Sequence, residues 1–561
     1  MSSALRKGAS HVSASEIDTL LPGTCSYGSS ASGTVITAPY FRGELPTLKR
    51  DEGDQHHGEE FDNVPTTKRQ LGLFSAAFLI FNRVIGTGIY ATPSNILRAS
   101  GSVGVSLIMW FVGAIIAACG TNVYIELGTG IPRSGGEKNY LEFIYCRPRF
   151  MATSIFAVYA LIMGTASANS VVFSEYLLHS MSFPPTRFNT RLVAFLCLTF
   201  IFLIHGTLLK WGLRLQNTLG LFKLVVLSLI ALSGIFCLFG VPGFAVRDGY
   251  QQPHNFEWSN FWEGSGTGAN AFVSGLYNVI WSFIGYSNAN YALSEVKNPV
   301  KTLKRAAPLA MFFVTSVYLL INVGYFAVVS KTDILESKHI VAALFFRNLF
   351  GPTTEKALSA FIALSTLGNL LSGQFSQGRV IQELGREGIL PYSSIFASNK
   401  PFGAPFSGLL IQYLVSCTFL LAVPPGDVYL FLISLSSYST SLVNALVAFG
   451  LLLLYTNSYR SWEWNPPFRA SKPIVVVFLI SNIFLIAAPF IPPTSGSKTY
   501  EKLPYWSHSV GAFSVSLVGI GYWYIWSVWR PNRNGYTLER DWTLQDDGVP
   551  RWTFRKVPVG Q

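Results

Sequence analysis

Two interruptions in the apolar segments of this sequence place backbone groups where they could bind a ligand. The first is Gly86-Thr87-Gly88, which divides the apolar run from Leu71 to Leu97. A helix that restarts after such a break presents unpaired N–H groups and a partial positive charge, and a carboxylate suits both. Glycine also lets a ligand approach the backbone closely. Taken alone, the same tripeptide would equally suit a close crossing of two helices.

The second interruption offers the complementary chemistry. The apolar run from Ala269 to Val296 is divided by Ser-Phe-Ile-Gly-Tyr-Ser-Asn at 282–288. Carbonyl groups freed there could accept hydrogen bonds from an ammonium group, and unpaired backbone persists in lipid only where it lines a cavity. Two such breaks therefore predict a site that binds both ends of a zwitterion. Trp281, just before the break, is large enough to close that site, although it could instead be a core or lipid-facing aromatic residue.

A lysine inside an apolar run is the second kind of candidate. Lys223 lies well inside the run 214–240, among Leu, Phe and Val. A lysine there is costly unless it faces a cavity or a partner, and burial favours the uncharged amine. If Lys223 points at the first break, it is a candidate proton carrier. It could instead brace the first helix or extend to the membrane surface.

Charges near the breaks suggest an inner gate. Arg83 stands one turn before the first break, and a salt bridge to Glu126 or Glu295 would close that gate. A purely structural pair between helices is the alternative. No acidic residue stands within either break. This argues against a cationic ligand and favours a neutral one with a medium-sized apolar side chain.

The elements that must position these residues are membrane helices. Of 561 residues only 12% are charged, and the mean hydropathy of +0.37 is too high for a soluble domain of this size. Twelve apolar runs are long enough to cross a hydrocarbon core of about 30 Å. They fall near 71–98, 102–129, 150–178, 192–208, 214–240, 269–296, 306–330, 355–384, 405–424, 427–456, 473–491 and 508–529. The sequence therefore predicts an all-α integral membrane protein with twelve transmembrane helices.

The loops and tails indicate how the chain is oriented. Lys and Arg are more numerous in the loops on one side of the predicted membrane, which places both tails in the cytosol. This bias also explains the formal net charge of +12, so nucleic-acid binding is not expected. The N-terminal tail, 1–70, and the C-terminal tail, 531–561, are predicted to be cytosolic and largely disordered. No cleavable signal peptide is expected, and the first run would direct insertion.

The sequence does not indicate an enzyme. The apolar runs contain no cluster of His, Asp or Glu at catalytic or metal-ligating spacing, so neither a metal nor a cofactor is expected. A channel is also disfavoured, because one chain with two dissimilar broken halves fits alternating access better than a symmetric pore. The six cysteines indicate no disulfide framework.

Several motifs occur in order along the membrane part of the chain. They are I-G-T-G-I-Y at 85–90, I-P-R-S-G-G-E-K-N-Y-L at 131–141, W-S-F-I-G at 281–285, E-V-K-N-P at 295–299 and G-R-E-G-I-L-P at 385–391. Together they resemble the amino acid–polyamine–organocation (APC) superfamily over about 71–456, with Tyr90 in place of the usual Phe. Within it, 82–88 and 135–143 are most similar to the fungal high-affinity methionine permeases, relatives of the L-type amino acid transporters.

The resemblance implies a LeuT-like fold in which the first and sixth helices are broken. The transmembrane domain, 71–530, would contain two inverted five-helix repeats, 71–240 and 269–456, and two extra helices, 473–530.

The resemblance also implies roles for the residues of the two breaks. The substrate carboxylate would be bound by Gly86, Thr87 and Gly88. The substrate amino group and the closure of the site would involve Trp281, Ser282, Phe283, Gly285 and Tyr286.

Two further residues carry an implied role and an alternative. Asn169 aligns with a substrate-contacting asparagine of bacterial relatives, although an interhelical hydrogen bond would explain it equally well. Lys223 corresponds to a lysine that carries the proton in some symporters of the superfamily, but exchangers keep it as well.

The predicted function is import of neutral L-amino acids, methionine above all, by a proton-driven secondary transporter in the plasma membrane. The alternatives are an exchanger or facilitator of the L-type family and a non-transporting amino acid sensor on the same fold. The predicted outer loop 179–190 has no cysteine, so no disulfide-linked heavy chain is expected as a partner.

Overall fold

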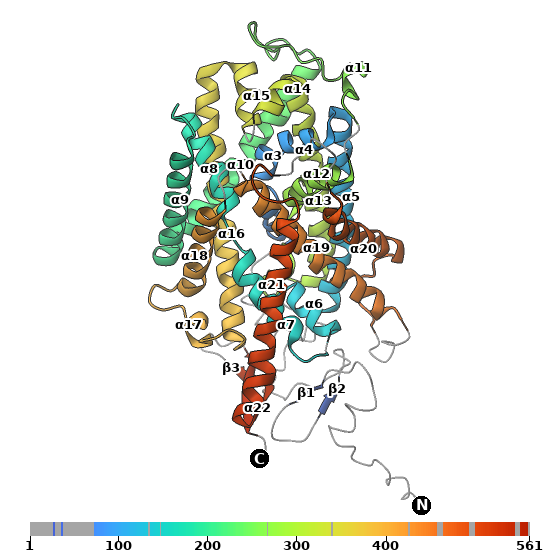
Figure 1. Ribbon diagram of the computed structural model, residues 1–561, viewed down its shortest axis with the longest axis vertical. Coiled ribbons are helices and arrows are strands. Elements are labelled where there is room, and N and C mark those ends of the chain that lie inside the picture. The colour runs from blue at the N-terminus through green and yellow to red at the C-terminus, as the bar shows by residue number, and fades with distance from the viewer. Residues whose placement is uncertain are drawn as a thin grey trace, which may run out of the picture.

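The computed structural model is mostly helical and describes most of the chain from residue 72 onward. The described residues are 26–28, 35–37, 72–132, 135–145, 147–265, 268–337, 340–423, 427–456, 464–492, 500–544 and 550–558. Most of the long helices run along the long axis of the molecule (Figure 1).

The predicted all-α membrane architecture is confirmed. Ten helical segments of the described chain are long and apolar enough to cross a membrane. They are Leu73–Ala91, Val103–Gly130, Met151–Ser180, Arg187–Thr207, Leu209–Leu238, Pro299–Val328, Pro352–Arg386, Val428–Leu454, Lys472–Phe490 and Ser507–Asn534. The two other predicted runs, 269–296 and 405–424, contain the shorter apolar helices α12 (Ala269–Phe283) and α18 (Phe406–Ala422).

The first predicted break is present. Helix α2 (Leu73–Val84) ends before the glycine-containing segment 85–87, and the chain becomes helical again in α3 (Gly88–Ala91) and α4 (Pro93–Ser100). Proline at the first position of α4 fits the start of a helix, where an N–H would have no partner. The helix ends at Gly101, which adopts a left-handed conformation with φ 76°.

The second predicted break is also present. Helix α12 ends at Phe283, a turn covers 284–287, and the chain continues as the 3₁₀ helix η2 (Asn288–Glu295). Gly285 in the turn has φ 121°, a conformation that side chains other than hydrogen disfavour.

The remaining elements lie between the two breaks and after the second break in the sequence. Between the breaks lie α5 (Val103–Gly130), α6 (Glu137–Ile144), α7 (Met151–Met163), α8 (Ser167–Ser180), α9 (Arg187–Thr207), α10 (Leu209–Leu238) and α11 (Trp258–Phe261). After η2 come α13 (Pro299–Val328), α14 (Lys331–Glu336), α15 (Val341–Phe350), α16 (Pro352–Arg386), α17 (Ser393–Ala397), α18, α19 (Val428–Leu454), α20 (Lys472–Ala487), η4 (Ala488–Phe490), α21 (Ser507–Trp523), the π-helix η5 (Tyr524–Trp529) and α22 (Arg530–Asn534). Helices α11, α14 and α15 lie at one end of the molecule, and α17 and α22 at the other (Figure 1).

A third interruption was not predicted. The expected run 150–178 is divided between α7 and α8 at 164–166. The polar groups freed there are bonded by α18: Gln412 Nε2 donates to Ala160 O at 2.9 Å, and Ser416 Oγ accepts from Ala166 N at 3.0 Å. Side chains of a neighbouring helix thus replace the missing intrahelical bonds.

Helix α10 shows which of its faces the bundle covers. Its buried face includes Leu219, Lys223, Val226, Leu227 and Ile230, which recur at helical spacing. The opposite face exposes Leu221, Val225 and Leu232, as expected of a surface that contacts lipid. Lys223 therefore lies on the face that turns into the protein.

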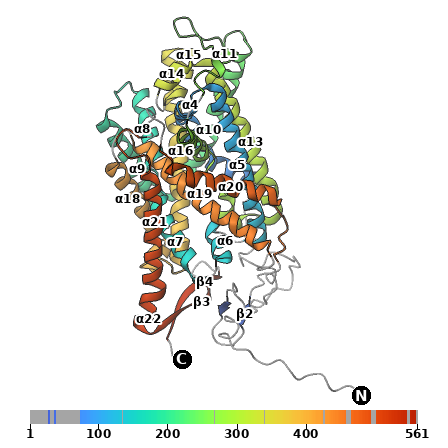
Figure 2. The same cartoon turned by 45° about the vertical axis from the view of Figure 1, so that its right-hand side comes forward.

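The prediction of a largely disordered C-terminal tail is wrong for most of 531–561. Strands β3 (Tyr536–Leu544) and β4 (Pro550–Pro558) form an antiparallel hairpin. The Phe554 ring packs 4.8 Å from Phe150 and 4.9 Å from Trp526, measured between ring centroids. Figure 2 shows the hairpin crossing from α22 toward the foot of α7. Packing of this partly buried aromatic residue against the bundle accounts for the order of this segment.

The predicted N-terminal tail, 1–70, lies outside the described residues apart from two short strands. These are β1 (Ser26–Gly28) and β2 (Val35–Thr37), which pair antiparallel.

Candidate binding site at the two helix breaks

The two breaks pack directly against each other. A Cβ atom added to Gly88 would lie 2.7 Å from Ser282 Cβ and 2.8 Å from Ser282 Cα. A Cβ added to Gly285 would lie 2.6 Å from Arg83 Cγ and 3.2 Å from Val84 N. Each break thus carries a glycine where it meets the other, and neither position has room for a larger residue.

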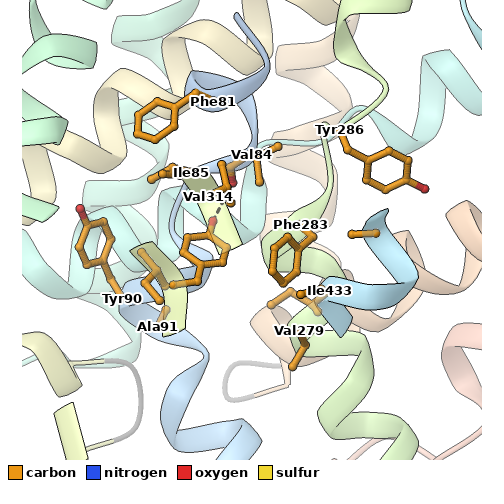
Figure 3. Close-up of a cluster of buried hydrophobic side chains, with 14 of the residues drawn as sticks. Phe81, Val84, Ile85, Tyr90, Ala91, Val279, Phe283, Tyr286, Val314 and Ile433 are labelled. Carbon is orange, nitrogen blue, oxygen red and sulfur yellow. Dashed lines mark hydrogen bonds between the residues drawn. The ribbon is translucent and has the colours of Figure 1, made fainter. Parts of the chain in front are cut away.

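Tyr318 of α13 joins the ends of the two broken helices. Its hydroxyl lies 3.0 Å from Val84 O at the end of α2 and 2.9 Å from Ser282 O near the end of α12. The last carbonyls of a helix have no intrahelical partner, so one buried hydroxyl serves both ends. Figure 3 shows Val84 and Ile85, at the first break, and Phe283, at the second, in one cluster of buried side chains. The sequence does not predict this role of Tyr318, because nothing in the run 306–330 distinguishes it from other tyrosines in apolar runs.

Lys223 points at the first break. Its Nζ donates to Ile85 O at 2.5 Å and to Asn82 O at 3.4 Å, and its side chain is buried. The amine therefore does not extend to the membrane surface. A lysine that binds the carbonyl end of a broken helix satisfies groups that would otherwise be orphaned in lipid.

A chain of amide and hydroxyl groups continues from the same carbonyl. Asn369 of α16 donates from Nδ2 to Ile85 O at 3.4 Å, and its Oδ1 accepts from Asn169 Nδ2 at 3.2 Å. Asn169 Oδ1 in turn accepts from Thr87 Oγ1 at 2.6 Å. Asn169 thus contacts the first break through Thr87. Asn369 was not predicted, although an asparagine in the apolar stretch of the run 355–384 is a signal that could have identified it.

The backbone donors of the first break lie at the start of α3. Intrahelical bonding resumes with Tyr90 N and Ala91 N, which donate to Thr87 O at 3.1 and 3.0 Å. The N–H groups of Gly86 and Thr87 precede these bonds and have no backbone acceptor among the residues that the structure describes. They are the groups that can bind an anion at this break.

The aromatic residues of the second break pack into the protein. Phe283 lies in edge contact with Tyr318, with ring centroids 5.1 Å apart. The Tyr286 hydroxyl accepts a hydrogen bond from Asn444 Nδ2 at 3.1 Å, and its side chain points away from the first break (Figure 3). Trp281 is half-buried. In this conformation Phe283 and Tyr286 can therefore reach a ligand through their backbone and not through their rings.

The predicted Arg83–Glu126 gate is not formed. Glu126 is buried and accepts hydrogen bonds from the Tyr455 hydroxyl, from Trp464 Nε1 at 2.9 Å and from Ala470 N at 2.7 Å. This carboxylate caps the segment between α19 and α20, so it is not available to Arg83. The side chain of Glu295, the other predicted partner, lies outside the described residues.

A different set of charges lies beside the second break. The Glu137 carboxylate of α6 accepts from Ser287 Oγ at 3.1 Å and from the Tyr291 hydroxyl. The neighbouring Lys138 pairs with Glu387, which follows α16, and with Glu142 at 3.4 Å. The first turn of α6 thus connects the second break and η2 to the end of α16.

Among the residues that the structure describes, no three His, Cys, Asp or Glu side chains are grouped so that they could hold a metal ion. The polar groups at the two breaks are hydroxyls, amides and backbone groups, together with the amine of Lys223, the Arg83 side chain beside Gly285 and the Glu137 carboxylate that accepts from Ser287. This chemistry suits binding of a small zwitterion and contains no nucleophile paired with a base.

Comparison with known proteins identifies the family. The family model described as amino acid permease matches residues 71–514. The chain is 44% identical over 516 residues to the high-affinity methionine permease of Saccharomyces cerevisiae, covering 91% of this chain and 89% of that protein. It is 29% identical to the low-affinity methionine permease of the same organism, over 95% of each chain. It is 27% identical to the human b(0,+)-type amino acid transporter 1, over 82% of this chain and 90% of that protein.

The match extends over both breaks and over most of the described helices. The resemblance inferred from the short motifs is confirmed, and so is the inference that the protein is not an enzyme. The chain belongs to the amino acid permease family of the APC superfamily, and it is a multi-pass membrane transporter.

Proposed function

We propose that the protein imports neutral L-amino acids, with methionine the preferred substrate, across the plasma membrane by alternating access and proton symport. The observation that carries this proposal is the direct contact of the two helix breaks at Gly88 and Ser282. That contact brings anion-binding N–H groups and ammonium-binding carbonyls to one place.

The substrate class follows from the chemistry at the breaks. The carboxylate would bind at Gly86, Thr87 and Gly88, and the amino group at the turn that contains Gly285. In the described part of the chain, the side chains that bond to the first break, Thr87, Asn169, Asn369, Tyr318 and Lys223 among them, include no acidic group that would compensate a cationic substrate. The 44% identity to a protein named high-affinity methionine permease supports methionine as the first substrate to test.

Proton symport rests on Lys223. A buried amine that binds Ile85 O can change the strength of that bond when it gains or loses a proton. Alternating access could then couple the proton to the substrate, because both would act on the first break. We further propose that the chain crosses the membrane twelve times in an inverted-repeat fold. We also propose that both tails are cytosolic, which the more basic loops on that side support.

An exchanger is the second candidate, and one observation favours it. The bond from Lys223 to Ile85 O is also what a purely structural brace would make. Exchange requires no net proton movement, so the two functions differ in what drives accumulation.

The test is uptake of radiolabelled methionine by vesicles that contain the full chain, with and without an imposed pH gradient. Symport predicts accumulation above the outside concentration when the outside is acidic, and its loss when a protonophore is added. Methionine entry only against preloaded amino acid would support the exchanger and contradict symport. Binding without any entry would indicate a sensor, and it would contradict both transport functions.

A further inference from the structure

Asn369 occupies a position between the two functional parts of the first break. It lies in the middle of α16, is 4% exposed, and its amide lies against Gly86. A Cβ added to Gly86 would be 2.9 Å from Asn369 Nδ2 and 3.0 Å from its Oδ1. A glycine at this position is therefore what allows the amide to lie on the backbone of the break.

The two ends of the Asn369 amide face different partners. Its Nδ2 donates to Ile85 O, the carbonyl to which Lys223 Nζ also donates. Its Oδ1 accepts from Asn169, which accepts from Thr87. An asparagine amide has a donor on one side and an acceptor on the other. A rotation of the amide that changes the hydrogen bond to one partner therefore also changes the bond to the other.

We propose that Asn369 is a positioning residue that couples the charge state of Lys223 to the binding of the substrate carboxylate at Gly86-Thr87-Gly88. This inference rests on the proposed proton symport and names the residue through which the two sites communicate.

The physical basis is competition for one carbonyl. A charged amine binds Ile85 O more strongly than a neutral amine does. A stronger bond from Lys223 weakens the hydrogen bond that Asn369 donates to the same oxygen. A weaker bond at Nδ2 changes the bond that Oδ1 accepts from Asn169, because hydrogen bonds in a chain polarise one another. Asn169 then changes its bond to Thr87, one of the residues that would bind the carboxylate.

In the described part of the chain, four helices near Lys223 carry the following charged, titratable or polar side chains. Arg83 of α2 is the charged group that interacts with it electrostatically. Helix α13 contributes the Tyr318 hydroxyl, which binds the neighbouring Val84 O. Helix α9 contributes His205, which lies against Gly212, about three turns from Lys223 along α10. Helix α16 contributes the neutral Asn369, which shares an acceptor with Lys223.

The test measures methionine affinity at acidic and at neutral pH on the full chain reconstituted in nanodiscs. Coupling is reciprocal, so the ratio of the two affinities reports how strongly proton and substrate act on each other. For the unmodified chain we expect a ratio of about 5 to 150, the range of coupled sites. Asn369→Ala is expected to reduce it to within about twofold of one, because the chain of bonds is cut.

Asn369→Asp provides a second, isosteric variant. It keeps the acceptor that faces Asn169 but puts a carboxylate oxygen where the donor to Ile85 O was. A carboxylate beside Lys223 stabilises the charged amine, so the pH at which the affinity changes should rise. The variant also lacks the donor to Ile85 O, so a coupling role of Asn369 predicts a lower affinity ratio as well, whereas a purely structural role predicts the shifted midpoint with an unchanged ratio.

Asn482→Ala is the matched control. Asn482 of α20 is equally buried, and its Nδ2 donates to Phe478 O of its own helix at 2.7 Å. This variant should keep the affinity ratio of the unmodified chain.

The outcomes separate this inference from the proposed function. If Lys223→Met removes the pH dependence of affinity while Asn369→Ala keeps it, symport stands and Asn369 is not the coupling residue. If Asn369→Ala does not fold, an unchanged affinity ratio in Asn369→Asp overturns the inference. If the unmodified chain binds methionine with the same affinity at both pH values, the proposed symport and this inference fail together.

Discussion

The two helix breaks differ in what holds them in place. At the first break, the carbonyls that end α2 are bound by side chains from three other helices. Lys223 and Asn369 bind Ile85 O, and Tyr318 binds Val84 O. All three side chains are buried in the helical bundle. Any change in the charge or the bonding of these groups therefore acts directly on the first break.

The second break is held by its own turn and by hydrogen bonds to α6. Gly285 turns the chain with φ 121°, and Ser287 and Tyr291 donate hydrogen bonds to Glu137 in α6. Lys138, the next residue in α6, pairs with Glu387 after α16. Ser287 and Glu387 lie in segments that connect helices, and such segments can move without breaking a helix.

The comparison suggests that the two breaks have different roles in transport. On the proposed symport mechanism, we expect the first break to respond to the ligand and to the proton through buried groups, and the second to respond to movement of the segments around it. Tyr318 is the one described side chain that bonds to carbonyls of both, so it transmits changes between them. Variants that affect one break, the other, or the connection between them should therefore have different effects on transport.

The largest effect is expected where the two breaks meet. Gly88→Leu would place side-chain atoms where Ser282 Cβ and Cα now lie, 2.7 and 2.8 Å from a Cβ at this position. Uptake of methionine should fall to background while the protein still reaches the membrane. Gly521→Leu is the control, because a Cβ there has nothing within 4 Å. Normal uptake by the Gly88 variant would show that the contact is not the substrate site.

The next effect concerns the first break alone. Lys223→Met removes the amine that binds Ile85 O and with it the proposed proton site. Accumulation driven by a pH gradient should be lost, while exchange of internal for external methionine continues. The carbonyl retains Asn369 as a partner, so the cost in folding stability should stay within about 1–3 kcal/mol.

Lys210→Met is the control for that variant, because Lys210 is exposed at the start of the same helix. Gradient-driven accumulation that survives in Lys223→Met would refute the symport proposal and leave the brace as the role of this lysine.

A smaller effect is expected at the connection between the breaks. Tyr318→Phe leaves Val84 O and Ser282 O without the shared hydroxyl, which should cost about 1–3 kcal/mol of stability and lower the melting temperature of the purified protein. Tyr325→Phe is a matched control on the same helix. Tyr325 is also buried, and its hydroxyl has no hydrogen-bond partner in the described part of the chain. Equal melting temperatures for the two variants would mean that Tyr318 does not hold the breaks together.

The parts of this fold that the sequence predicts are those with a local physical cost. A glycine-rich interruption of an apolar run, the length needed to cross a bilayer and a lysine in an apolar segment each stand out without any knowledge of the partners. Both breaks and the helical membrane architecture could therefore be inferred, whereas the sequence left the direction of Lys223 open between the first break and the membrane surface.

The parts that it does not predict depend on which segments meet. Asn369 and Ile85 are 284 positions apart, and Glu126 binds Trp464 across 338 positions. A salt bridge between Arg83 and Glu126 was a reasonable expectation from charge alone, but packing gave Glu126 other donors. The C-terminal hairpin is held by the packing of the partly buried Phe554 against Phe150, a contact that composition does not reveal.

The smallest predicted effect concerns the second break alone. Glu137→Gln keeps the shape and one acceptor oxygen but removes the charge that strengthens the bonds from Ser287 and Tyr291. If these bonds weaken by about 1 kcal/mol, the equilibrium between η2 bonded to Glu137 and η2 released from it should change about fivefold. Transport rate should change by a similar factor, while the pH dependence of methionine affinity, which depends on the first break, stays the same. Glu257→Gln, at an exposed carboxylate bonded to His254, should change neither quantity. A Glu137 variant whose pH dependence changes as much as its rate would show that the two breaks do not act separately, because a contact to the second would then control the chemistry of the first.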